Sequence, residues 1–167
     1  MGGIFNPYPA RASRDLPGDQ KALLMSLSWI DEHRVQYLQD GEKGHFWDST
    51  VVGGPGPVPT LLLTTTGRKS GEKRIMPLIY AFTEHGYVIV ASKGGAPQHP
   101  DWYLNLTANP EVEVQVANRK FKATAETTQG EQRQALWDLM LPIWPPYADY
   151  QLKTDRQIPV VLLRPQA

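Results

Sequence analysis

Cysteine is absent from the 167-residue sequence, and so is any excess of charge of one sign. Without cysteine the chain can form no disulfide, no thiolate metal site and no cysteine nucleophile. Lysine and arginine together number 17, and aspartate and glutamate together also number 17, so the net charge is zero. Because nucleic-acid binding generally requires a basic excess that displaces counterions, we expect no nucleic-acid partner.

Long apolar runs are also missing. No stretch approaches the roughly 18 apolar residues of a membrane-spanning helix. The first residues, which include Pro7 and Pro9, lack the apolar core of a signal peptide, so a cytoplasmic protein is expected. The four histidines show no metal-ligand or catalytic spacing, and the motifs of serine hydrolases and zinc proteases do not occur. We therefore predict no metal site and a chemistry that a cofactor carries.

The patterns of apolar residues predict one domain over residues 18–167, preceded by an extended segment over residues 1–17. Helical spacing occupies residues 19–40, 100–109 and 131–141. Strand patterns occupy 60–66, 73–83, 86–92, 111–116, 120–127 and 158–163. Hairpin-connected strands that are interrupted by helices predict an α+β fold built on an antiparallel barrel.

The helix expected at residues 19–40 has one apolar stripe, formed by Leu23, Leu24, Leu27, Ile30 and Leu38. Such a stripe usually packs on a sheet. Peripheral contact of this N-terminal helix with a membrane surface is the alternative, although its polar face is less basic than membrane-surface helices usually are.

A basic turn follows the strand at 60–66. Gly67 and Gly71 bound a five-residue turn that carries Arg68, Lys69 and Ser70. Arginine binds phosphate or carboxylate bidentately and lysine binds it as a point charge, so the turn is suited to an anion. The alternative is an ordinary solvated hairpin turn, since such turns are often basic.

A glycine-rich loop follows the strand at 86–92, which is apolar on both faces and is expected to be central. The loop reads Ser92-Lys93-Gly94-Gly95 and leads into the helix at 100–109. Paired glycines allow the backbone to approach a flat ligand, and a helix start supplies free amides for an anion. The alternative is a loop that needs glycine only to turn.

These stretches together closely resemble the deazaflavin-dependent nitroreductase family, from about residue 60 to Val161. The matching motifs are Thr65-Thr66-Gly67-Arg68-Lys69-Ser70-Gly71, Arg74, Pro77-Leu78, Ala91-Ser92-Lys93-Gly94-Gly95-Ala96-Pro97, Pro100, Trp102-Tyr103-Leu104-Asn105 and Ala108-Asn109-Pro110. The resemblance implies a split β-barrel of the flavin-reductase and pyridoxamine-oxidase type with flanking helices. It also implies hydride transfer from reduced coenzyme F420.

The resemblance also implies roles for individual residues. The cofactor's phosphate and acidic tail would be held by the basic positions, and other residues would line the ring. The phosphate and tail anchors are Arg68, Lys69, Ser70 and Arg74; the ring-side residues are Pro77, Ala91, Ser92, Lys93, Gly94, Trp102 and Asn105, with Ser92 also a catalytic candidate. Asp101 departs from the pattern, because an apolar residue against the cofactor is expected there.

Aromatic residues at positions 144, 147 and 150 are spaced three apart, so one helical turn would place them on one side. The resemblance implies that Trp144, Tyr147 and Tyr150 bind the substrate, with the two tyrosines as catalytic candidates. Trp144 stands where the family has a tyrosine. Two prolines make a regular helix before Tyr147 unlikely to form. The alternative is ordinary aromatic core.

The resulting hypothesis is an oxidoreductase that transfers a hydride from reduced F420 to a small-molecule acceptor, namely a quinone, a nitroaromatic compound or an activated alkene. Two alternatives stay open. One is an oxidoreductase that uses flavin mononucleotide on the same barrel, and the other is a non-catalytic cofactor carrier. Either a monomer or a homodimer is compatible with the sequence.

Overall fold

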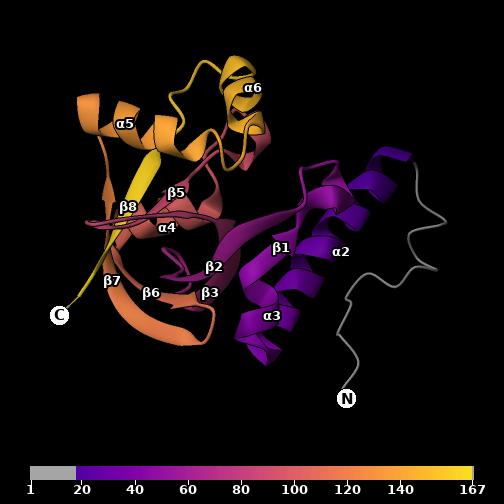
Figure 1. Ribbon diagram of the computed structural model, residues 1–167, viewed down its shortest axis with the longest axis horizontal. Coiled ribbons are helices and arrows are strands. Elements are labelled where there is room, and N and C mark those ends of the chain that lie inside the picture. The colour runs from indigo at the N-terminus through magenta and orange to yellow at the C-terminus, as the bar shows by residue number, and fades with distance from the viewer. Residues whose placement is uncertain (1–17, 167) are drawn as a thin grey trace.

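A computed structural model of the chain describes the backbone of residues 18–166 and the side chains of residues 29–166 (Figure 1). The extended segment expected at residues 1–17 and the leucine side chains of the stripe at positions 23, 24 and 27 lie outside these residues. The assignment of residues 18–167 to one domain stays a prediction.

The elements follow one another as α2 (Gly18–Gln39), α3 (Gly41–His45), β1 (Phe46–Asp48), η1 (Ser49–Val52), β2 (Pro57–Thr66), β3 (Lys73–Ile79), β4 (Ala81–Thr83), β5 (Gly86–Val90), η2 (Lys93–Gly95), α4 (Asp101–Ala108), β6 (Glu111–Val116), β7 (Arg119–Thr127), α5 (Gly130–Met140), α6 (Pro146–Leu152) and β8 (Val160–Pro165).

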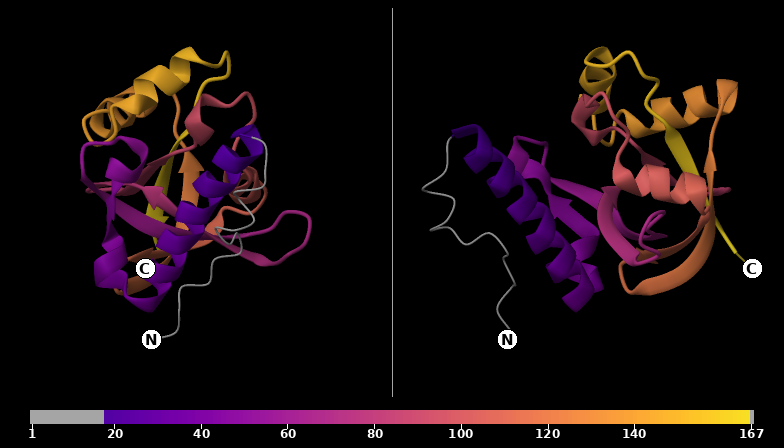
Figure 2. Two further views of the ribbon diagram at one scale, coloured as in Figure 1. Left: turned by 90° about the vertical axis from the view of Figure 1, so that its right-hand side faces the viewer. Right: turned by 180° about the vertical axis from the view of Figure 1, so that it is seen from behind.

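The strands of the described residues form one sheet in the order β1-β2-β6-β7-β8-β5-β4, and β3 also pairs with β2. Every pairing is antiparallel. The sheet curls into a barrel, with α2 along one side and with α5 and α6 across one end (Figure 2). The predicted α+β split barrel with flanking helices is therefore confirmed.

The segment at residues 73–83, expected as one strand, is divided at Tyr80. Its first part, β3, pairs with β2 until Ile79 lies opposite Thr60. The Tyr80 N–H still donates to the carbonyl of Pro59 at 3.2 Å. From Ala81 onwards the chain pairs with β5 instead. One continuous segment therefore joins the two ends of the sheet, because it changes its partner strand at Tyr80.

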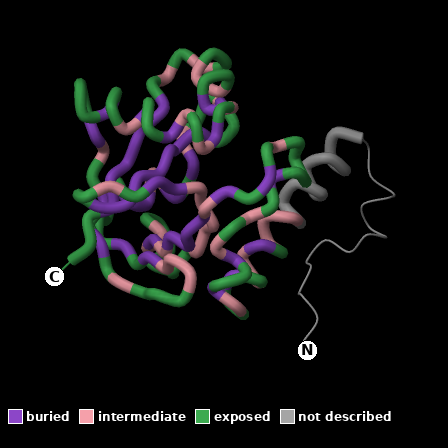
Figure 3. The backbone as a smooth tube through the Cα atoms, in the orientation of Figure 1, coloured by how far each residue is buried: buried purple, intermediate pink, exposed green. Residues whose placement is uncertain are grey.

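Alternate residues of the central strands face two apolar cores, as the period of two in a strand requires. Ile89 of β5 and Val161 of β8 point into the barrel. Val88 and Leu162 point the other way, against Met140 of α5. Figure 3 shows that the buried backbone is concentrated in these strands. The prediction of a central strand that is apolar on both faces is confirmed, since all of β5 is buried.

Prolines set the starts of the last two elements. Pro146 occupies the first turn of α6, where its missing N–H would have no helical partner in any case. The short helix thus begins only one residue before Tyr147, in keeping with the expectation that the two prolines disfavour a regular helix earlier in the chain. The last strand begins at Val160 rather than at residue 158, because the N–H of Ile158 donates to Gln151 Oε1 and Pro159 has no N–H. Pro159 thus precedes a central strand.

The C-terminal half of α2 is attached to the barrel by the fully buried Tyr37. Its hydroxyl donates to the carbonyl of Thr60 and accepts from the N–H of Ala117, both at 2.9 Å. Burial raises the pKa of Tyr37 to about 12, so the hydroxyl stays protonated. Within the described residues no helix is long and apolar enough to cross a membrane.

Replacement of Tyr37 by phenylalanine is expected to lower the free energy of unfolding by about 1–3 kcal/mol, because the buried carbonyl of Thr60 and the part-buried N–H of Ala117 lose a partner. Urea unfolding measures the change. Tyr103→Phe is the matched control, since the Tyr103 hydroxyl is only part-buried and bonds to another hydroxyl, that of Thr127. Equal stability of Tyr37→Phe and the parent would contradict this account of how α2 is attached.

Candidate functional site

A groove of about 1450 Å³ runs along β3, on the side of the barrel where β3 and β5 are not paired. It brings together every predicted site residue except Ala91. The predicted residues that line it are Arg68, Lys69, Ser70, Arg74, Pro77, Ser92, Lys93, Gly94, Trp102, Asn105, Trp144, Tyr147 and Tyr150. Segments that are separated by up to 82 positions in the sequence, from Arg68 to Tyr150, thus share one surface.

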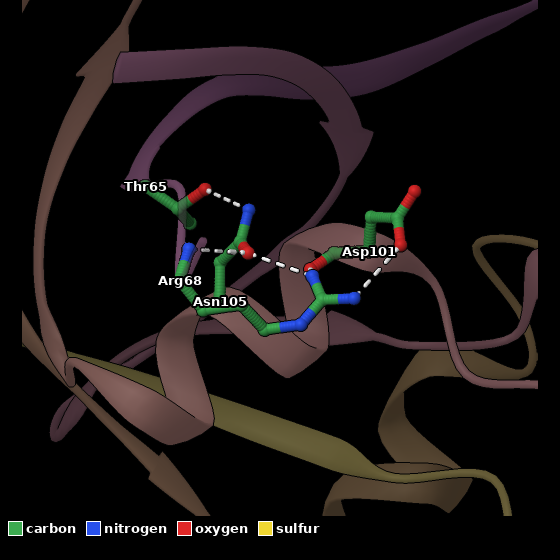
Figure 4. Close-up of polar contacts among 4 residues, drawn as sticks. All are labelled: Thr65, Arg68, Asp101 and Asn105. Atoms are coloured by element: carbon green, nitrogen blue, oxygen red, sulfur yellow. Dashed lines mark hydrogen bonds and ion pairs between the residues drawn. The ribbon is translucent and has the colours of Figure 1, made fainter. Parts of the chain in front are cut away.

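The basic turn is attached to α4 through Asn105, whose side chain is buried (Figure 4). Asn105 Oδ1 accepts from the backbone N–H of Arg68 at 3.1 Å and from its Nη1 at 2.9 Å. Asn105 Nδ2 donates to Thr65 Oγ1 at 3.3 Å. A buried amide with both ends bonded is a stable anchor. It holds the turn after β2 against the start of α4.

Asp101 forms an ion pair with Arg68 at 3.4 Å across the same junction. Its side chain is 85% exposed, so the pair contributes little to stability. The acidic residue that departs from the family pattern is thus the partner of a predicted anchor. Arg68 is engaged with α4, and the cations that remain at this end of the groove are Lys69, Lys73 and Arg74.

Lys69 and Arg74 differ in their contacts. Lys69 is exposed and forms no ion pair within the described residues. Arg74 pairs with Glu72 at 3.3 Å, and both side chains are more than half exposed. Ser70 Oγ accepts from the N–H of Glu72 at 3.1 Å, which leaves its hydroxyl proton able to donate. This end of the groove can therefore bind a phosphate or a carboxylate.

The glycine-rich loop adopts a left-handed backbone at three successive residues. The φ angles are 46° at Lys93, 63° at Gly94 and 83° at Gly95. A Cβ atom at Gly94 would meet no atom within 4 Å, so this backbone faces open space. Ala91 behaves differently, because its side chain is fully buried in the barrel core and does not line the groove. The structure thus does not support the ring-side role implied for Ala91.

The aromatic residues at the other end of the groove belong partly to the core. Trp144 and Tyr147 are 6% and 5% exposed, and both also pack against the second apolar core. Trp144 Nε1 donates to the Tyr150 hydroxyl at 3.4 Å. Burial raises the pKa of Tyr147, with a smaller contribution from Tyr150. Tyr147 is consequently a weaker acid than a free phenol and stays protonated at neutral pH.

Sequence reasoning missed the aromatic wall that faces Trp144 from α2 and β1. The rings of Trp29 and Trp47 stack with centroids 4.7 Å apart, and Trp47 lies 6.0 Å from Trp144. His33 also lines this wall and bonds through Nε2 to the carbonyl of Gly44 at 2.9 Å. Burial lowers the pKa of His33. The short β1 and η1 lie in a stretch that has no periodic pattern, so no sequence signal placed Trp47 at the site.

Comparisons with known proteins show which family the chain resembles. A family model described as F420H(2)-dependent quinone reductase matches residues 34–165. An F420H(2)-dependent quinone reductase of Mycobacterium tuberculosis is 45% identical over 141 residues, which cover 81% of this chain and 95% of that protein. The solved structure of an F420-H2 dependent reductase, FDR-A, has a TM-score of 0.60 at 48% identity and covers 64% of this chain and 94% of its own. A solved domain-swapped dimer has a TM-score of 0.62 at 42% identity, with 83% and 99% covered.

Gly95 allows α6 to lie against the loop, and this contact can be tested. A Cβ at Gly95 would lie 2.6 Å from the carbonyl oxygen of Tyr150. Gly95→Ala is therefore expected to displace α6 and to lower Tm by several degrees more than Gly94→Ala does. The second variant is the matched control, because both glycines have positive φ and only Gly95 is crowded. Thermal unfolding measures both, and equal losses would mean that backbone strain alone matters.

Proposed function

The chain belongs to the F420H(2)-dependent quinone reductase family, and from this premise we propose how its groove carries out the reaction. It is an oxidoreductase that uses coenzyme F420 and transfers a hydride to a quinone. Family membership favours F420 over flavin mononucleotide and a reductase over a carrier. The predicted resemblance to deazaflavin-dependent reductases is confirmed, and the family description specifies a quinone as the acceptor.

The proposal rests on the distribution of charged and aromatic residues along the groove. Lys69, Lys73 and Arg74 line it together from the basic turn and the start of β3, whereas Trp47 and Trp144 line another part of it with ring centroids 6.0 Å apart. The volume of about 1450 Å³ exceeds the roughly 300–1,000 Å³ of a usual small-molecule site. There is thus room for an anionic cofactor and a flat acceptor together.

The residues present fit F420. Its phosphate and carboxylates require cations and hydroxyl donors, which Lys69, Arg74 and Ser70 supply from an exposed turn. A flat ring requires backbone without side chains beside it, and the open space next to Gly94 meets this need. Trp102 and Pro77 add apolar surface between the two ends. We assign the phosphate and tail to the basic turn and the ring to the loop at residues 92–94.

When bound, reduced F420 supplies the hydride. A quinone that accepts a hydride becomes a hydroquinone anion and takes up one proton at its oxygen. We assign stabilisation of that oxygen to Tyr147, because Tyr147 lines the groove and its protonated hydroxyl has no hydrogen-bond partner within the described residues. Its raised pKa favours donation of a hydrogen bond over loss of the proton, so we assign delivery of the proton to solvent. Trp144 and Trp47 provide flat surface for the acceptor ring.

The position of α2 bears on the membrane alternative. Trp29 and His33 of α2 line the groove, and Tyr37 is buried against the barrel. This arrangement favours the interpretation that the C-terminal half of α2 forms a wall of the site. A cytoplasmic location, nitroaromatic and alkene acceptors, and the choice between monomer and homodimer stay predictions.

Lys69→Ala is expected to weaken F420 binding by about 1–3 kcal/mol, or roughly five- to a hundredfold in Kd, if its charge-assisted contact is direct. Combination with Arg74→Ala should weaken binding further and make Kd less dependent on salt. Titration of F420 fluorescence measures both effects. Lys122→Ala, at an exposed lysine of β7 away from the groove, is the control. Unchanged affinity in the double variant would remove the basic turn from the site.

Tyr147→Phe is expected to reduce kcat for quinone reduction by about 10²–10³-fold while F420 binding stays normal, because it deletes one preorganised donor. Tyr150→Phe should have a smaller effect, since its hydroxyl already accepts from Trp144. Steady-state oxidation of F420H2 by a panel of quinones and nitroaromatics measures both. Rates equal to the parent in both variants would leave the tyrosines as packing residues. A parent that is inert towards every quinone would refute the proposed function itself.

A further inference from the structure

Arg156 lies in the segment between α6 and β8, and its guanidinium group reaches under the glycine-rich loop. The side chain is part-buried and forms no ion pair within the described residues. It is not among the residues to which the resemblance assigns a role, and it does not line the groove. It nevertheless donates three hydrogen bonds to carbonyl groups of the loop.

The guanidinium group bonds to three carbonyl groups of the loop and to the histidine that follows it. Nη2 donates to the carbonyl of Ser92 at 2.7 Å, and Nε donates to that of Ala96 at 2.9 Å. Nη1 donates to the carbonyl of Ala91 at 3.2 Å and lies 3.1 Å from His99 Nδ1. Burial and the neighbouring Arg156 both lower the pKa of His99, so Nδ1 of the neutral ring accepts. The contacts bracket the left-handed residues at 93–95 on both sides.

The backbone of Arg156 is fixed in turn by α6. Gln151 Nε2 donates to the Arg156 carbonyl at 2.8 Å, while Gln151 Oε1 accepts from the N–H of Ile158 at 2.9 Å. The N–H of Arg156 donates to Thr154 Oγ1 at 3.3 Å. The helix that carries Tyr147 and Tyr150 therefore also sets the position of the guanidinium group. The side chains of Gln151 and Arg156 thus connect α6 with the glycine-rich loop.

We propose that Arg156 is a positioning residue that holds the loop at residues 91–96 in the conformation that receives the F420 ring. The assignment rests on the proposed function for the identity of the ligand, but the bonds themselves do not depend on it. Lys93 is not a glycine, so its positive φ needs support from surrounding contacts. The planar fork of arginine can bond to several carbonyls in fixed directions, which the single ammonium group of lysine cannot do.

Amide hydrogen exchange of the cofactor-free protein tests the positioning directly. In the parent, the N–H of Gly95 donates to Ser92 and that of Ala96 donates to Lys93. Arg156→Ala should speed exchange at these two amides by at least about tenfold. The amide of Ala91, which bonds to Pro159, should be little changed and serves as an internal reference. Arg164→Ala, which removes an exposed ion pair with Glu126, is the control variant. Unchanged exchange at Gly95 and Ala96 would overturn the proposal.

Binding and kinetics then connect the loop to the cofactor. Arg156→Ala should raise the Kd for oxidised F420 by roughly ten- to a hundredfold. It should also raise the KM for F420H2 more than it lowers kcat. Arg156→Lys retains the charge, so it should restore little of the affinity if geometry matters. Millimolar guanidinium should restore part of the affinity for F420 to Arg156→Ala and should leave the affinity of Arg164→Ala unchanged.

These outcomes distinguish the positioning role of Arg156 from the specific requirement for its guanidinium group. Full affinity in Arg156→Lys would overturn the role of the fork, and normal affinity in Arg156→Ala would overturn the positioning role altogether. If Arg156→Ala does not fold, the exchange and binding comparisons between Arg156→Lys and the parent decide instead. A parent that fails to bind F420 would refute the proposed function, while the exchange result would still test the effect of Arg156 on the loop.

Discussion

The groove exists because the barrel is closed by one segment that changes partner. Residues 73–79 pair with β2 and residues 81–83 pair with β5, so the sheet is joined through the chain at Tyr80 rather than by a ladder between β3 and β5. Within the described residues β3 has β2 as its only strand partner, and its other edge faces the groove. An edge strand also tolerates Pro77, which has no N–H to donate. The split in the barrel is thus the place where ligands can reach backbone and side chains together.

Buried polar contacts then set the shape of this split. Asn105 holds the basic turn against α4, and its amide has partners at both ends. At the opposite wall the Trp144 and Tyr147 side chains serve the second apolar core and the groove at once. Burial of a phenol weakens it as an acid but strengthens its hydrogen bonds, because the local dielectric is low. The groove therefore combines exposed cations with two largely buried aromatic side chains, those of Trp144 and Tyr147.

The class of fold and the family could be predicted from the sequence alone, and the residues expected at the site, apart from Ala91, line one groove. Alternation along residues 111–116 and the apolar run at 87–91 identified the half-buried and central strands, since side-chain period reports burial directly. The motifs around Arg68, Gly94 and Trp102 identified the cofactor family, and these residues line one groove. Turn-forming residues and the side-chain alternation of a strand depend only on neighbours in the chain, so local sequence patterns are sufficient to predict them.

Features that depend on contacts between distant segments could not be predicted from local patterns. The break at Tyr80 arises because a different strand becomes the partner, and no local pattern marks that exchange. Ala91 is turned into the core although its neighbour Ser92 lines the groove. Trp47 reaches the site through a three-residue strand, and Arg156 reaches the loop across 60 or more positions. The sequence pattern indicates which chemical groups are present and which secondary structure a segment forms. The direction of a side chain towards a distant partner is fixed only when the barrel has closed.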